Sequence, residues 1–343
     1  MKDLYQRLKP LGFSRKDLLA RVLPDWWEDK MAEHAVNRRM AEMYIGQALG
    51  LTLAQLADPK ATLTFDDVTQ ALFKRWKDSD LERLRPAVLL ASDLSRLVLA
   101  ATQTQRPTAA LAKRDAAALR DSLLAERPVV DLAGLVDLCW AHGIPVIPMT
   151  YLPEGSKKVD GMALSVAIHD GTTHPVIIVN VSGRDVPARV AWFVAHEMGH
   201  IALGHLGESL CIDVDMTVAD DPREQEANAF ATALIYGRTP QFLRRSRRGA
   251  SSASWKAEQL ERRARSLARE YKTTPAAIAL SYAHQHAGNR WPVARKAINL
   301  LQEHEGALAI VRDALVRHVD PDEISPERLG FLAHALDLDV FPD

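Results

Sequence analysis

The segment from Val190 to His205 contains the residues best suited to chemistry, in the sequence VAWFVAHEMGHIALGH. His196 and His200 are four positions apart, so on a helix their imidazole rings lie on one face, one turn apart, where both can bind one metal ion. Glu197 stands beside that face, where a carboxylate can take a proton from a water molecule activated by the metal. The HExxH pattern depends on three fixed residues, and a metal would satisfy two histidines in an otherwise apolar helix. We therefore expect one Zn²⁺ per chain, with His196 and His200 as ligands and Glu197 as the catalytic base.

A catalytic zinc ion needs a third protein ligand, and residues 221–237 offer two candidates. The first two residues of this segment, an aspartate and a proline, are typical of a helix start. On that helix Glu224 shares a face with Asn228, one turn later, whereas Glu226 lies about 200° away around the axis. The spacing favours Glu224 as the ligand and Asn228 as a residue that holds a ligating histidine. Glu226 as the ligand, or a solvated helix face for both carboxylates, stays open.

The segment before the histidines predicts a helix and three short strands. An amphipathic helix is expected over residues 129–143, followed by a strand at 144–149. Residues 160–168 and 175–181 are rich in valine and isoleucine, and the Asp-Gly pair between them is typical of a hairpin turn. Since the histidine-bearing helix follows directly, the order of elements predicts an α+β fold. An extended peptide substrate is expected to add to the hairpin near residues 162–166.

The motif HEMGH, followed by EQEANAFATALI and YKTTPAAIALSYAHQ, resembles the ImmA/IrrE family of zinc metallopeptidases. The resemblance covers residues 128–288 and implies a zincin-like domain, in which a small β-sheet accompanies the active-site helix. It implies a thermolysin-like site with Glu224 as the third ligand and Asn228 behind a histidine. The implied activity is site-specific cleavage of a regulatory protein in a response to stress, DNA damage or phage. The expected protein substrate is a helix-turn-helix repressor encoded nearby.

Three further residues near the motif are weaker candidates for a role in the site. His205 and Tyr236 could stabilise the oxyanion of the reaction, although each is more often a packing or surface residue. Relatives often carry a Met-Pro pair where this chain has Tyr236 and Gly237, so the rim of the pocket is expected to differ. Cys211 could be a thiol ligand, but a buried cysteine is the favoured interpretation.

The N-terminal residues 1–105 are predicted to form a helical domain, and residues 37–58 follow the pattern of a helix-turn-helix. A first helix with an apolar stripe through Met40 and Met43 ends at a glycine, and Thr52 can cap a second helix. That second helix offers few side chains able to read bases, so a plain helical hairpin is the favoured alternative.

The rest of the chain completes the predicted domain organisation. Residues 106–127 are expected to form a linker and a helix, and residues 128–288 the peptidase domain. Residues 289–343 are expected to form a C-terminal helical region, so that helices flank the peptidase domain on both sides.

Composition indicates an ordinary globular protein, with 47% hydrophobic and 25% charged residues. No apolar stretch approaches the ~18 residues of a membrane span, and the N-terminus lacks the apolar core of a signal peptide. The two cysteines, Cys139 and Cys211, lack metal-type spacing and suggest a reducing compartment. We therefore expect a cytoplasmic protein without membrane contact.

The net charge of −1 argues against strong overall attraction to nucleic acid, but residues 238–272 are locally basic. This stretch could contact nucleic acid or could be a solvated helix face. An alternative function follows from these features. The chain would be a helix-turn-helix transcription regulator, or an antitoxin-like binding protein, whose peptidase-like domain acts as a sensor. The intact Glu197 disfavours that alternative, because a sensor does not need a catalytic base.

Overall fold

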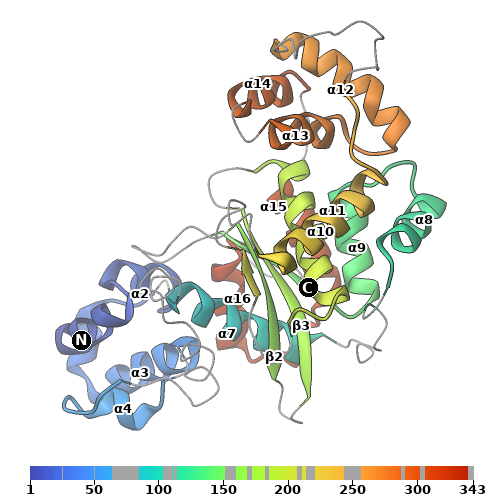
Figure 1. Cartoon of the computed structure of the whole chain (residues 1–343). Coiled ribbons are helices and arrows are strands. Elements are labelled where there is room, and N and C mark those ends of the chain that lie inside the picture. Colours follow the sequence, from blue (N-terminus) through green and yellow to red (C-terminus); the bar gives the residue numbers. More distant parts are fainter. Residues whose placement is uncertain are drawn as a thin grey trace, which may run out of the picture.

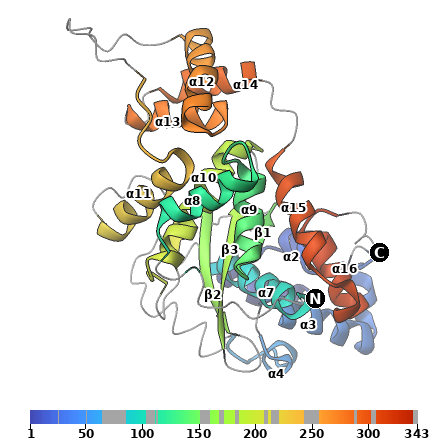
Figure 2. The same cartoon turned by 90° about the vertical axis from the view of Figure 1, so that its right-hand side faces the viewer.

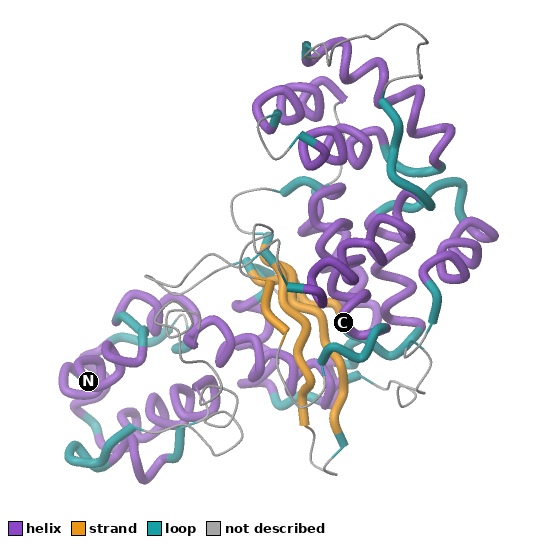
Figure 3. Tube along the Cα trace, in the orientation of Figure 1, coloured by secondary structure: helices purple, strands orange, loops and turns teal. Residues whose placement is uncertain are grey.

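Helices dominate the structure, and one small β-sheet lies among them (Figure 3). The computed structural model describes residues 1–24, 26–49, 51–63, 85–102, 111, 114–150, 160–167, 172–181, 185–206, 211–213, 221–242, 256–286, 290–301 and 306–338. The prediction of a mostly helical α+β fold is confirmed. In the part of the chain so described, none of the helices is both long enough and apolar enough to cross a membrane.

The sheet has four strands in the order β1-β3-β2-β4, which are Val146–Met149, Thr173–Asn180, Gly161–Ala167 and Cys211–Asp213. β2 and β3 form the predicted antiparallel hairpin, with Met162 opposite Ile178, and β1 runs parallel to β3. The predicted Asp-Gly turn falls at residues 168–171, outside the described residues. β1, β2 and β3 are buried along most of their length, which explains their enrichment in branched apolar residues.

The fourth strand corrects the prediction of an open hairpin edge. β4 pairs with residues 161–163 of β2, so Met162 and Ala163, the first two residues of the stretch expected to receive a peptide, are already paired. The sequence did not predict β4, because three residues are too few to show an alternating pattern.

Helices cover the sheet on both sides. The helix that carries the histidines, α10 (Pro187–Ala202), contacts β2 and β3, and α9 (Leu132–Ala141) packs beside it. Figure 1 shows α7 (Arg85–Ala101) on the opposite side of the sheet from α10, and α7 contacts β2. The helix predicted over residues 129–143 is thus confirmed as α9, capped by the Asp131 carboxylate, which accepts a hydrogen bond from the backbone amide of Gly134.

The remaining helices extend this arrangement at three places. The α11 and α12 helices follow the sheet in the chain, and α13 and α14 pack on α12. Nearer the C-terminus, α15 contacts α9 and β1. The last helix, α16, contacts α7 and the N-terminal helix α2. The C-terminal helices therefore contact both the peptidase region and the N-terminal region, and α14 belongs with α12 and α13 across the boundary placed at residue 288. Their bounds are α8 Ala116–Glu126, α11 Pro222–Tyr236, α12 Ala257–Tyr271, α13 Pro275–Gln285, α14 Trp291–Leu301, α15 Ala307–His318 and α16 Pro326–Ala335, with a 3₁₀ turn η3 at Pro321–Glu323.

The segment predicted as linker and helix contains α8. Residues 103–110 lie outside the described part of the chain, but α8 itself packs on α11. The buried Arg120 of α8 donates hydrogen bonds to the carbonyls of Leu234 (2.9 Å) and Ile235 (2.6 Å), in the last turn of α11. A guanidinium with these acceptors satisfies carbonyls that a helix end leaves without partners.

The N-terminal region is helical as predicted, with bounds α1 Lys2–Leu8, η1 Lys9–Leu11, α2 Arg15–Arg21, η2 Asp29–Glu33, α3 Ala35–Leu49 and α4 Leu53–Ala57. Thr52 caps α4, and its hydroxyl accepts a hydrogen bond from the backbone amide of Gln55. The predicted apolar stripe of α3, through Met40, Met43, Tyr44 and Leu49, is buried only in part: Leu49 faces the core together with Ala41 and Ile45, whereas Met43 is 44% exposed. The buried face of α3 is therefore rotated relative to the predicted stripe and shares Leu49 with it.

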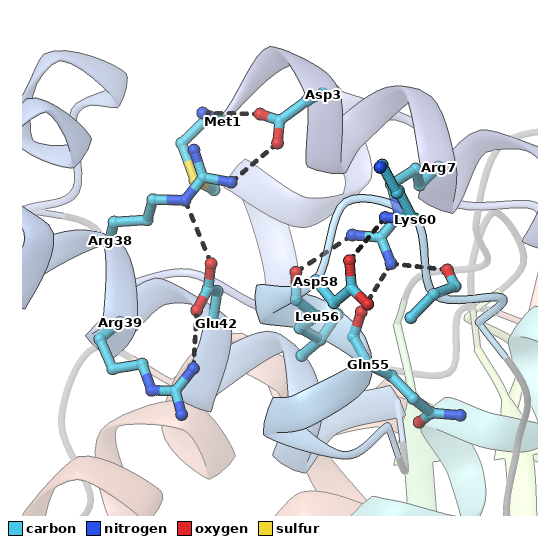
Figure 4. A network of polar contacts seen from close by, with 11 residues as sticks. Met1, Asp3, Arg7, Arg38, Arg39, Glu42, Gln55, Leu56, Asp58 and Lys60 are labelled. Atoms are coloured by element: carbon cyan, nitrogen blue, oxygen red, sulfur yellow. Dashed lines mark hydrogen bonds and ion pairs between the residues drawn. The ribbon is translucent and has the colours of Figure 1, made fainter.

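The helix pair α3–α4 is fastened to α1 by charged side chains (Figure 4). Arg38 of α3 donates to the Asp3 carboxylate at 2.8 Å, and Arg7 of α1 donates to the carbonyls of Gln55 (2.6 Å) and Leu56 (3.1 Å). The Gln55 side chain is itself engaged, since its amide oxygen accepts from the Thr52 backbone amide at 2.9 Å. The α4 helix is five residues long, and its one side chain suited to reading bases, that of Gln55, is therefore engaged in the N-terminal cap of the helix.

Candidate metal centre

The α10 helix presents three polar side chains in an otherwise apolar and buried segment. His196 and His200 are each 2% exposed, and Glu197 is fully buried. Pro187 begins the helix at a position where no backbone donor is needed, and the apolar residues around the motif pack against the sheet. The Nε2 atoms of the two histidines face each other at 3.0 Å, as expected for rings one helical turn apart on one face.

The α11 helix brings Glu224 to the same point. Asp221 caps this helix, and its carboxylate accepts from the backbone amide of Arg223 at 2.9 Å. One turn inside, Glu224 Oε2 lies 3.1 Å from His196 Nε2, and Glu224 Oε1 lies 3.3 Å from His200 Nε2. Hydrogen bonds from the two imidazoles hold the pKa of the Glu224 carboxyl well below its usual range, and the bond from His196 contributes most.

These three side chains are a candidate metal-binding group, since one ligand atom from each lies within 4.8 Å of the others. Two imidazole nitrogens and a carboxylate are a donor set typical of catalytic zinc. Around a tetrahedral ion with bonds of about 2.0–2.1 Å, neighbouring ligand atoms are about 3.3 Å apart. The contacts of 3.0–3.3 Å match that spacing, so the residues fit a zinc ion.

A glycine lets the two helices approach closely enough for this. Gly199, inside the HEMGH motif, faces α11, where a Cβ atom would lie 3.1 Å from Ala227 Cα and 3.2 Å from both Ala227 O and Phe230 Cβ. Two of these three neighbours belong to the α11 backbone, which cannot move without the helix. Gly199 therefore sets the distance at which Glu224 reaches the histidines.

The outward-facing nitrogen of each histidine has a different partner. Asn228 of α11, one turn after Glu224, places Oδ1 3.1 Å from His196 Nδ1. This is the contact expected for Asn228 from its spacing, and it leaves Nε2 as the His196 nitrogen that faces the candidate ligand group.

The second histidine is held by a pair that sequence reasoning did not connect. His205 Nδ1 lies 3.1 Å from His200 Nδ1, and His205 Nε2 lies 3.0 Å from Glu226 Oε2. If His200 binds the metal through Nε2, its Nδ1–H donates to His205 Nδ1, and His205 Nε2–H donates to the Glu226 carboxylate. Glu226 thus points toward His205 and not toward the ligand group, because it lies about 200° around α11 from Glu224. The sequence feature that could have indicated this contact is the histidine five residues after His200, in the spacing HExxHxxxxH.

Comparison with known families adds one finding. The model of the IrrE N-terminal-like domain, which describes peptidase family M78, matches residues 139–281. The chain carries an IrrE N-terminal-like domain. The resemblance inferred from the motifs is thereby confirmed, and the match supports a metallopeptidase. No curated protein and no solved structure matches the chain.

The match with the IrrE-like domain runs from the second half of α9 to α13, and so includes the sheet, α10 and α11. The domain predicted over residues 128–288 extends beyond it at both ends. The extra N-terminal residues contact the matched region directly, since Val130 forms a β-bridge with Thr273 and its amide donates to the carbonyl of Lys272 at 2.9 Å.

Tyr236 is not part of the centre of the IrrE-like domain, which corrects its assignment as an oxyanion candidate. It lies twelve residues after Glu224 on α11, a rise of about 18 Å. Its hydroxyl is buried and donates to the carbonyl of Ala277 at 2.9 Å, so it joins α11 to α13. His205 is likewise turned to His200 and Glu226, which gives it a supporting contact in place of the predicted oxyanion role. The side chain of Cys211 lies outside the described residues.

Glu197 lies beside the ligands at the start of the hairpin. A Cβ atom on Gly161 of β2 would lie 3.2 Å from Glu197 Oε1, so any larger residue there would crowd the carboxylate. A buried carboxylate next to a candidate metal-binding group is suited to accept and release a proton.

Proposed function

We propose that this chain is a zinc-dependent endopeptidase of the cytoplasm that cleaves a regulatory DNA-binding protein, in a response to stress, DNA damage or phage. The observation that carries the proposal is the convergence of His196, His200 and Glu224, with the buried Glu197 beside them. The match to the IrrE N-terminal-like domain supports it, because that domain belongs to a peptidase family.

His196, His200 and Glu224 would hold the zinc ion, which when bound polarises the scissile carbonyl as a Lewis acid. Glu197 accepts a proton from the attacking water as the new carbon–oxygen bond forms, and returns it to the amide nitrogen as the carbon–nitrogen bond breaks. Asn228 and His205 keep the two imidazole rings oriented during these steps. The substrate class, a helix-turn-helix repressor encoded nearby, is taken from the resemblance to the ImmA/IrrE family.

The test combines zinc analysis with cleavage of that neighbouring protein by three purified proteins. Wild type is expected to hold one zinc ion per chain and to cut. Glu197→Gln keeps the ligands, so it should retain zinc and lose cleavage, whereas Glu224→Ala should lose zinc. Wild type that neither contains nor takes up zinc would refute the metal centre. Cleavage that survives Glu197→Gln would refute the role of Glu197.

The competing function is a transcription regulator or antitoxin-like protein that uses this domain as a sensor. In that case zinc would be bound, but candidate repressors would bind wild type and Glu197→Gln equally and stay intact. The short α4 helix and the engaged Gln55 side chain argue against direct base reading by residues 37–58.

A further inference from the structure

The near-neutral total charge hides a strong separation of charge along the chain. Residues 238–301 contain 14 of the 43 basic residues and only 3 of the 44 acidic residues, a net charge of +11. The rest of the chain holds 29 basic and 41 acidic residues, a net charge of −12. A basic segment of this size creates a local positive potential that the total charge does not reveal.

This segment contains the three helices α12, α13 and α14, which pack on one another. Figures 1 and 2 show them grouped at one end of the molecule, away from α1–α4. They meet the first half of α10, where His284 stacks on Trp192 at a centroid distance of 5.5 Å, whereas the ligands His196 and His200 are in its second half. The basic helices therefore lie apart from the candidate metal centre. The arginines of the run at 244–248 lie outside the described residues.

The α12 helix carries its positive charge as a stripe. Arg262, Arg265, Arg269 and Lys272, at the C-cap, are spaced by three, four and three residues, so they follow one exposed face over about 15 Å. The opposite face packs into the core through Leu260, Ala264, Leu267 and Tyr271. Arg265 forms an ion pair with Glu261, but among the described residues the other three cations of the stripe form none.

The two neighbouring helices add no negative charge to this end of the molecule. Neither α13 nor α14 contains an acidic residue, and α14 contacts α12. Arg295 and Lys296 of α14 are both exposed. We define the basic surface as the four cations of the α12 stripe.

We propose that the basic surface binds the phosphate backbone of double-stranded nucleic acid. Arginine accounts for 11 of the 14 basic residues between 238 and 301, and its planar fork matches the geometry of a phosphate. A membrane-surface helix would need large apolar side chains beside the charges, but every exposed position of α12 is polar. Single-strand binding relies on exposed aromatic rings that stack on bases, and the exposed face of α12 has none. Because phosphate contacts position a protein without reading bases, the binding is independent of sequence.

The test measures anisotropy of a fluorescent 20-base-pair duplex of random sequence titrated with the full-length protein at 50 and 200 mM salt. Wild type should bind, with an affinity that falls steeply as salt rises. Arg262→Glu/Arg269→Glu should weaken binding at 50 mM salt by at least ~10-fold and reduce the slope of log K against log salt by about 2. The control, Lys9→Glu/Lys16→Glu, changes the net charge equally at exposed positions of the N-terminal region and should bind as wild type does.

Circular dichroism and melting temperature check that both double variants are folded. Three results would overturn the proposal: no duplex binding at 50 mM salt, equal loss in the two double variants, or tighter binding to a single strand of the same length. Tighter binding to vesicles containing anionic lipid, at equal phosphate concentration, would assign the basic surface to a membrane instead. Zinc content and cleavage play no part in these measurements, so the proposal stands or falls separately from the proposed function.

Discussion

Two different histidine environments lie along α10: the buried pair His196 and His200 on the helix itself, and the partly buried His284 of α13, which packs against it. At the candidate metal centre, both ring nitrogens of His196 and of His200 face polar partners. One turn before His196, Trp192 packs against His284, which also meets Trp291 edge-on at a centroid distance of 4.9 Å. Burial there lowers the pKa of His284 to about 4. Burial among aromatic rings thus disfavours the charged form of His284, whereas the polar partners of His196 and His200 orient their rings toward one point.

The largest effect is expected from Glu224→Ala, because it removes a ligand atom and not a partner of a ligand. Zinc affinity, measured by competition with a chelator, should fall by more than ~100-fold. That value is the upper end of the losses caused by replacing a residue that only supports a ligand. The matched control is Glu226→Ala, which removes a carboxylate two residues away on the same helix. Its side chain is 61% exposed and supports His200 only through His205, so a loss of at most ~10-fold is expected. Equal losses in the two variants would contradict the assignment of Glu224.

The next effects compare the two histidine supports directly. Asn228→Ala and His205→Ala should each weaken zinc binding by about 10–100-fold, because each frees one imidazole ring to rotate away. Asn228→Asp keeps an acceptor oxygen for His196 and should recover most of the loss. Only the His205 support depends on an exposed carboxylate, that of Glu226, whose interaction with His205 is screened by salt. The difference in zinc affinity between wild type and His205→Ala should therefore be smaller at high salt, and the difference for Asn228→Ala should not change. Supports that respond identically to salt would show that Glu226 does not act through His205.

Local patterns predicted that His196, His200, Glu224 and Asn228 would come together, and tertiary contacts decided the rest. The spacing of His196 and His200, the cap of α11 and the face shared by Glu224 and Asn228 are properties of single helices, which periodicity reveals. The link from His205 to Glu226 joins two helices through a loop, and no periodic pattern connects residues 21 positions apart. For the same reason the sequence mistook the exposed Met43 for part of the buried face of α3. A face is chosen by what packs on it, which hydrophobicity alone does not say.

A smaller effect, this time on stability, should come from the close crossing of α10 and α11. Gly199→Ala places a Cβ atom against the α11 backbone, and overpacking of this kind costs about 1–3 kcal/mol of unfolding free energy. It should also weaken zinc binding, since relief of the clash moves Glu224 away from the histidines. Gly330→Ala is the control, because it is also in a helix and its Cβ would meet nothing within 4 Å. Helix propensity makes that change neutral or stabilising by up to about 1 kcal/mol. A Gly199→Ala protein as stable as Gly330→Ala would show that the helices can separate freely.

The last effect concerns His284 and is a loss of stability that appears only below neutral pH, because at neutral pH the imidazole is neutral in both the folded and the unfolded chain. Between its ordinary pKa of 6.5 and its folded pKa of about 4, the unfolded chain binds a proton that the folded chain does not. Stability contributed by the neutral ring is therefore present above pH 6.5 and falls as the pH is lowered toward 4. His284→Phe removes this proton but keeps an aromatic ring between Trp192 and Trp291.

The quantity to measure is the difference in melting temperature between wild type and His284→Phe at a series of pH values, in which carboxylates common to both proteins cancel. Wild type should lose stability relative to the variant from pH 6.5 down to about 4, and the difference should then level off. His34→Phe makes the same substitution at an exposed histidine and controls for the effect of the substitution itself. A flat difference for His284→Phe would mean that the ring takes up its proton in the folded state as easily as in water. The contrast between the aromatic environment of His284 and the polar environment of His196 and His200 would then lose its electrostatic basis.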